Sequence, residues 1–206
     1  MFLGHFAVGL IASRLERRLP LGTAFVAAQL PDAVWPFLLL AGVETVTITP
    51  GATAVTPLRF DHYPWSHSLV MVAAWGLVFM AGYGLLFRAS KAAFLLLPLT
   101  LSHWVLDAAS HVPDVPVWPG GGPLVGLGLW RSLPLTLLVE GLFFAAAVFV
   151  FARGRTLRWS FWILIGVLGV IYAASVFGPP PPSPAAIGWS MIPLVPALWW
   201  WGNRSV

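Results

Sequence analysis

The amino-acid sequence predicts an all-α protein, a polytopic transmembrane helical bundle, and three observations support this class. Hydrophobic residues make up 59% of the chain, and charged residues make up only 9%. Soluble proteins carry about a quarter charged residues. The mean hydropathy is +0.86, and long apolar runs recur. The 206 residues leave no room for a separate soluble domain, so we expect one integral domain over 1–206. Its metal-site half would be 1–152, with additional spans over 159–202.

We expect six full spans of ~20 residues and a short N-terminal embedded helix. The first apolar segment, 2–13, is too short to cross ~30 Å of hydrocarbon as a straight helix. The run 21–41 holds Asp32 between two prolines. Backbone groups that proline frees in lipid must be satisfied inside the protein, so a broken span here is expected to face a cavity or a site. A simple packing kink is the alternative. The polar, turn-rich stretch 42–65 indicates an external loop.

Later apolar runs give the remaining spans, which lie at 66–87, 92–111, 131–152, 159–177 and 185–202. A loop rich in Gly and Pro, 112–130, interrupts this series, and Gly178 with the four following prolines forms a stiff, extended connector. If the connections alternate between the two sides of the membrane, nine of the eleven basic residues fall on one side. Arg59 and Arg131 are the two exceptions. The positive-inside rule makes the crowded side cytoplasmic.

The fourth span ends in a polar stripe. His103, Asp107 and His111 are spaced four residues apart, so a helix of 3.6 residues per turn places them on one face, about one turn apart. A helix presents several ligands to one metal ion in this way. The alternative is a polar stripe that hydrogen-bonds neighbouring helices, although ionisable groups at membrane depth are costly and usually functional.

Further polar groups are expected to converge with this stripe in the outer half of the bundle. By the predicted topology these are His5, Asp32, His67 and Glu140. The chain has no Cys, so a metal would be held by His nitrogen and carboxylate oxygen alone. Zn²⁺ or Mn²⁺ suits such a set. The donors suffice for one or two ions, and a pair of ions generates hydroxide near neutral pH and clamps both oxygens of a phosphoester.

The remaining polar residues receive weaker assignments. Glu140 could be a ligand, a general base or a carboxylate that orients a His, and His111 could ligate or move protons. Arg59 and Arg131 could bind a phosphate or lipid headgroup, although interfacial snorkelling explains them equally well. Asp61, His62 and Asp114 lie in loops beside aromatic residues, where a solvated role is expected.

Four motifs together resemble the predicted membrane-bound metal-dependent hydrolases of bacteria, of the YdjM/YbcI type. They are Gly4-His5, Gln29-Leu30-Pro31-Asp32, Trp65-Ser66-His67-Ser68 and Ser102-His103-x-x-x-Asp107-x-x-x-His111. The resemblance covers the first ~140 residues. It implies a hydrolase whose polar positions are His5, Asp32, His67, His103, Asp107 and His111. The His-x-x-x-Asp rhythm is also remotely similar to the helical fold of zinc-dependent phospholipase C and nuclease.

The sequence thus favours a membrane-embedded metal-dependent hydrolase of an ester, with a phosphoester of a lipid or another membrane-accessible substrate as the expected substrate. Its expected location is the bacterial inner membrane, with the site facing the extracytoplasmic side. No nucleic-acid partner is expected, because the basic residues cluster at the ends of apolar runs. Two alternatives remain. One is a transporter of divalent cations or protons that uses the same cluster, and the other is a non-catalytic membrane scaffold.

Overall fold

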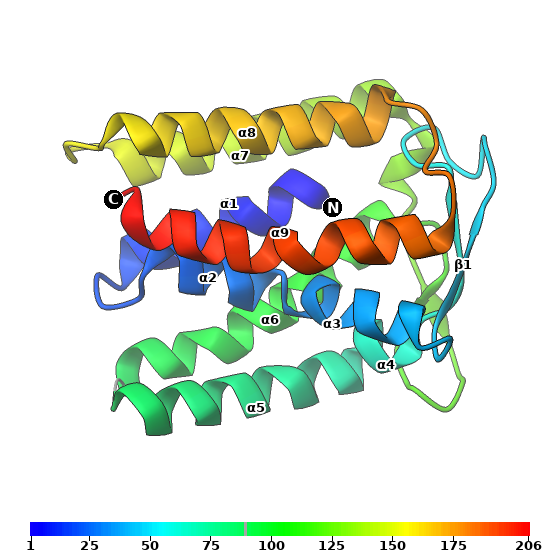
Figure 1. Cartoon of the computed structure of the whole chain (residues 1–206), viewed down its shortest axis with the longest axis horizontal. Helices are drawn as coiled ribbons and strands as arrows, with labels where there is room; N and C mark the ends of the chain where they lie inside the picture. Colours follow the sequence, from blue (N-terminus) through cyan, green and yellow to red (C-terminus); the bar gives the residue numbers. More distant parts are fainter. Residues whose placement is uncertain (89) are drawn as a thin grey trace.

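In the computed structural model, which describes residues 1–88 and 90–206, the helices run roughly along one long axis (Figure 1). The elements in chain order are α1 (Phe2–Leu15), α2 (Leu21–Ala28), α3 (Leu30–Leu40), β1 (Thr45–Ile48), β2 (Leu58–His62), α4 (Pro64–His67), α5 (Leu69–Phe87), α6 (Ser90–Ser110), β3 (Val115–Pro116), β4 (Leu124–Val125), the 3-10 turn η1 (Leu129–Arg131), α7 (Leu133–Ala152), α8 (Trp159–Phe177) and α9 (Pro184–Arg204). The strands form two short antiparallel hairpins, so the helical class is confirmed.

Four of the described helices, α5 to α8, are long and apolar enough to cross a membrane. The pair α2 and α3 passes the same test as one broken span, which brings the count to five. The helix α9 has 21 residues, but its Trp, Pro and Gly content keeps its mean hydropathy below that of the other four. The prediction of six full spans is therefore not confirmed. The first segment is a helix of 14 residues, short as expected.

Large apolar side chains cover much of the outer surface of the bundle. Leu85 on α5, Leu142 on α7 and Val170 on α8 are each more than 60% exposed. Water would penalise such a surface, whereas lipid does not. The interior is packed around aromatic residues, and its largest cluster includes Phe6 and Phe151. These apolar helices are those of a membrane protein.

The break between α2 and α3 lies at Gln29 and bends the pair by 55°. Pro31 has no N–H, so it cannot donate to the carbonyl of Ala27 four residues earlier. Side chains of α6 take that place. Thr100 Oγ1 donates to Ala27 O at 3.0 Å, and His103 Nδ1 lies 2.8 Å from Ala28 O. The freed backbone is satisfied inside the protein, as the sequence predicted for a broken span.

The loops gather at one end of the bundle and the basic turns at the other. Figure 1 shows the 42–65 loop, the 112–130 loop and the connector from α8 to α9 together at the right-hand end. The turns after α1 and α7 and the last residues of α5 lie at the opposite end with the C-terminus. The turn-rich, β-leaning stretch 42–65, expected as an external loop, contains the hairpin β1–β2. The span predicted from residue 66 is divided at Ser68, whose hydroxyl accepts a hydrogen bond from Met71 N and caps α5.

Candidate metal centre

The predicted stripe on α6 is buried in the interior of the bundle. His103 is completely buried, and Asp107 and His111 are each 4% exposed. Asp107 lies between the two histidines, with Oδ2 at 3.1 Å from His103 Nε2 and Oδ1 at 4.0 Å from His111 Nε2. The helix therefore presents all three side chains to one place, as the spacing predicted.

The helix α1 brings His5 to this stripe. The His5 ring stacks on the His103 ring, with centroids 3.9 Å apart and an interplanar angle of 7°. Its Nε2 lies 3.1 Å from Asp107 Oδ1. The ammonium of Met1 also reaches the pair, at 2.7 Å from Asp107 Oδ1 and 3.3 Å from His5 Nε2. A positive charge thus lies against the carboxylate and the imidazole together, and a metal ion bound by these two side chains would have to displace it.

Asp32 and His67 approach His103 from the other side. Asp32 Oδ1 lies 3.4 Å from His67 Nε2 and 4.0 Å from His103 Nε2. The donor atoms of Asp32, His67 and His103 lie within 4.8 Å of one another, as do those of His5, His103 and Asp107. Two groups of metal ligands therefore meet at His103, and both could hold an ion.

The broken helix fixes the proton of His103. A carbonyl oxygen can only accept, so the contact with Ala28 O assigns the ring proton to Nδ1. The lone pair is then on Nε2, toward Asp32 and Asp107. Because Nδ1 is engaged, His103 can ligate one ion at a time.

A relay from the 42–65 loop fixes His67. Glu44 is 1% exposed, and its carboxylate accepts hydrogen bonds from Trp65 N, Ser66 N and Ser66 Oγ at 2.8, 2.8 and 2.6 Å. The Ser66 hydroxyl donates its proton to Glu44, so it accepts from His67 Nδ1, which lies 2.6 Å away. The lone pair of His67 is therefore also on Nε2, toward Asp32.

The 112–130 loop fixes His111 in the same way. His111 Nδ1 lies 3.0 Å from Asp114 Oδ1, which also accepts from Tyr63 OH at 3.1 Å. Burial raises the pKa of the Tyr63 hydroxyl well above its ordinary value, and the Asp114 carboxylate raises it further, so Tyr63 remains the donor. The remaining lone pair of His111, on Nε2, faces Asp107.

Three imidazole lone pairs therefore point toward the carboxylates of Asp32 and Asp107. His103 Nε2 lies 3.1 Å from Asp107 Oδ2 but has no hydrogen-bond partner among the described residues, because the approach lacks hydrogen-bond geometry. When these rings are neutral, their lone pairs and the carboxylates that face them repel, and protonation of the rings would relieve that repulsion. A divalent cation would convert this repulsion into ligation, and metal-bound histidines ordinarily donate their second ring N–H to a carboxylate or carbonyl. The donor set therefore fits a metal ion.

The structure separates the other predicted site residues from this centre. Glu140 is fully buried on α7, and its Oε2 accepts from Leu3 N at 2.8 Å, so it caps the start of α1. It belongs to neither ligand group, and its Oε1 has no hydrogen-bond partner among the described residues. Arg59 pairs with Asp61 at 2.7 Å on the exposed hairpin, and Arg131 is exposed beside η1. His62 is exposed at the end of β2, apart from the other histidines.

Three residues that hold the histidines of the centre were not predicted to do so. Asp114 was expected to be solvated, but its side chain is 21% exposed and holds His111. Glu44 and Ser66 received no assignment, although they hold His67. The available signal was weak: Ser66 precedes His67 directly, Asp114 follows His111 by three residues, and Glu44 is the first acidic residue after Asp32.

Comparison of the chain with protein-family models, with curated proteins and with solved structures gives no significant match. The fold and the cluster define a helical membrane protein with a buried set of His and Asp residues able to hold a metal ion. The resemblance to the YdjM/YbcI type rests on the four motifs alone.

Proposed function

We propose that this protein is a membrane-embedded metal-dependent hydrolase of phosphoesters. The supporting observation is the convergence of three histidine lone pairs on Asp32 and Asp107, each set by a hydrogen bond at the other ring nitrogen. Zn²⁺ fits best because the donors are imidazole and carboxylate without thiolate, and Mn²⁺ is the second choice. One or two ions can be accommodated, with His103 serving one of them.

The metal would supply an activated water and stabilise negative charge on the phosphoester oxygens. His5, His103 and Asp107 form one ligand group, and Asp32 and His67 complete the other with His103. In hydrolysis, water adds to phosphorus, the bond to the leaving oxygen breaks, and that oxygen takes up a proton. Glu140 lines the same cavity as Asp32 and has an oxygen, Oε1, without a hydrogen-bond partner among the described residues, so it is our candidate for this proton transfer, with His111 as the alternative.

The proposed setting is the bacterial inner membrane, with the centre toward the extracytoplasmic side. The basic turns lie together at the end of the bundle opposite the hairpins, which supports a cytoplasmic position for that end. The centre is connected to the hairpin end through Glu44 and Asp114, which lie in the two loops.

Metal analysis of the purified protein in lipid bilayers tests the proposal. Wild type should bind Zn²⁺, lose it to a chelator and regain it, and Asp107→Asn should lose at least about 10–100-fold in affinity. The exposed Asp61→Asn is the matched control and should retain the metal. Hydrolysis of a phosphodiester should be lost in parallel. Unchanged metal binding in Asp107→Asn would contradict the metal centre, and ion flux through the bilayers would favour the transporter.

A further inference from the structure

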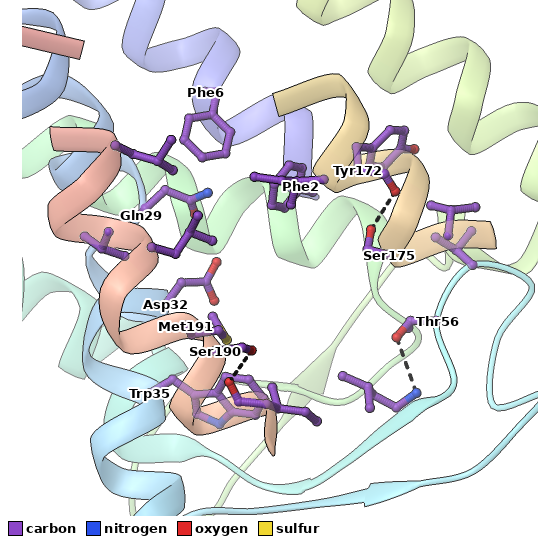
Figure 2. Close-up of a pocket in the computed structure, with 18 of the residues that line it drawn as sticks. Phe2, Phe6, Gln29, Asp32, Trp35, Thr56, Tyr172, Ser175, Ser190 and Met191 are labelled. Atoms are coloured by element: carbon purple, nitrogen blue, oxygen red, sulfur yellow. Dashed lines mark hydrogen bonds between the residues drawn. The ribbon is translucent and has the colours of Figure 1, made fainter. Parts of the chain in front are cut away.

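A cavity of about 500 Å³ lies beside the metal centre, between α8 and α9 (Figure 2). The helices α1, α2 and α3 supply its inner wall. Most of its lining is apolar, and includes Phe6 and Phe25 on the inner wall and Leu194 and Val195 on α9. Its volume is within the range of pockets that hold small molecules.

The sequence of the last two helices explains why this space stays open. Gly188 lies against Leu40 of α3, and Gly202 lies against Gly22 of α2, where an added Cβ would come within 2.9 Å of the neighbour. The helix α9 is thus held on α2 and α3 rather than on α8. Four prolines of the connector, extended at ~3.1 Å per residue, span ~12 Å. Packed helices lie only ~8–10 Å apart, so the connector is long enough to hold the ends of α8 and α9 farther apart than direct packing would.

Polar groups also line the cavity, from more than one of the elements around it (Figure 2). Asp32, a member of the second ligand group, lines the cavity directly. Three other buried side chains of the lining, Gln29 and Trp35 from the segment that carries Asp32 and Tyr172 from α8 (Figure 2), have a polar atom without a partner among the described residues: Gln29 Oε1, Trp35 Nε1 and Tyr172 OH. Trp130 Nε1 and Glu140 Oε1 also line the cavity; they lie near each other but do not meet at hydrogen-bond geometry. Buried polar groups are ordinarily satisfied, so these unpartnered atoms indicate that the cavity takes a ligand with a polar group.

We propose that the cavity holds the apolar chain of a lipid phosphoester and places the ester group at Asp32, beside the metal ligands. This assignment of substrate class rests on the proposed function. The apolar walls match a hydrocarbon chain, and the indole and phenol donors match phosphate oxygens. The space accommodates one chain with its head group, so the rest of a larger lipid would stay in the bilayer.

The route of entry is between α8 and α9. Ser175 on α8 and Ser190 on α9 line the cavity and are exposed. Each hydroxyl donates at 2.8 Å to a carbonyl three residues earlier in its own helix, Tyr172 O or Ile187 O, so its proton is not left unpaired toward lipid. These two serines are small, and their hydroxyls are already hydrogen-bonded within their own helices. They therefore leave room at the mouth of the cavity for a lipid chain to pass in from the bilayer.

Photocrosslinking in bilayers tests the assignment. The probe is a long-chain alkyl phosphodiester with a diazirine at the end of the chain, and the crosslinked residues are mapped by mass spectrometry. We expect crosslinks on cavity residues such as Met191 and Leu194. Ser175→Phe fills the mouth and should reduce these crosslinks about tenfold, which corresponds to displacing about two methylene groups. Ala173→Phe, exposed on the same helix but outside the cavity lining, should crosslink like wild type.

Crosslinks on Met191 and Leu194 no stronger than those on the lipid-facing Phe149 would overturn the assignment, as would equal labelling in Ser175→Phe. Metal content and turnover of a short-chain phosphodiester, measured on the same samples, test the proposed function separately. If the wild-type protein neither binds metal nor turns over the phosphodiester but still gives the crosslinks, the hydrolase is refuted and the binding site for the chain stands. If metal binding and turnover are present but the crosslinks are absent, only the binding site for the chain is refuted.

Discussion

The substitution Glu44→Gln tests the hydrogen-bond relay that holds His67. The carboxylate of Glu44 accepts three hydrogen bonds, two from the backbone N–H groups of Trp65 and Ser66 and one from the Ser66 hydroxyl. An amide has one accepting oxygen. That oxygen will stay with the two N–H groups, because the flipped amide would point its NH₂ group, a donor, at the N–H donors of Trp65 and Ser66. The amide nitrogen then points at the Ser66 hydroxyl and donates to it.

This reversal reaches the metal centre. The Ser66 hydroxyl no longer donates to residue 44. It should donate instead to His67 Nδ1, at 2.6 Å, rather than to the more distant Tyr63 O, at 3.4 Å, so the ring proton moves to Nε2 and the lone pair toward Asp32 is lost. Loss of this support should weaken metal binding about 10–100-fold. This corresponds to ~1.4–2.8 kcal/mol. If His67 keeps its proton on Nδ1, the buried Ser66 hydroxyl is left without a good acceptor instead, at a similar cost of ~1–3 kcal/mol.

Two measurements decide the outcome. Competition with a chromophoric chelator gives the Zn²⁺ affinity, and ¹⁵N NMR of the histidine side chains gives the tautomer of His67. Glu16→Gln is the matched control, because Glu16 accepts one hydrogen bond, from Arg18 N, at the far end of α1. An unchanged affinity and an unchanged His67 tautomer in Glu44→Gln would refute the relay.

Two further predictions concern His111 and the packing of α9. His111 is in neither ligand group, but its Nε2 faces Asp107 at 4.0 Å, so it could complete the coordination. Asp114→Asn removes the anionic partner of His111, and if His111 ligates, Zn²⁺ affinity should fall about 10–100-fold in the same chelator assay; equal affinity would leave His111 with the proton-transfer role alone. Gly22→Ala places a methyl group against the backbone of Trp199, so it should destabilise the protein by about 1–3 kcal/mol in thermal unfolding. Gly82→Ala, with open space around the new Cβ, should be neutral or slightly stabilising, and equal effects of the two would contradict the close α2–α9 contact.

The membrane class and the α6 stripe could be predicted because both depend on local sequence. Hydropathy over ~20 residues and a spacing of four residues on a helix do not require a tertiary structure. The number of spans was less accessible. The helix α9 has the length of a span, but its Pro, Trp and Gly residues lower its hydropathy, and its position depends on glycine contacts with α2 and α3.

The sequence by itself determined that His103, Asp107 and His111 share one helix face and that Asp32 lies in a broken span. Only the tertiary structure decided that His103 belongs to two ligand groups and that the freed carbonyl of Ala28 sets its tautomer. Ring orientation depends on partners far away in the chain, 75 residues away for His103 and 22 for the Glu44–Ser66 contact that orients His67. No local pattern encodes such distances, because they are fixed by how α2, α6 and the loops pack together.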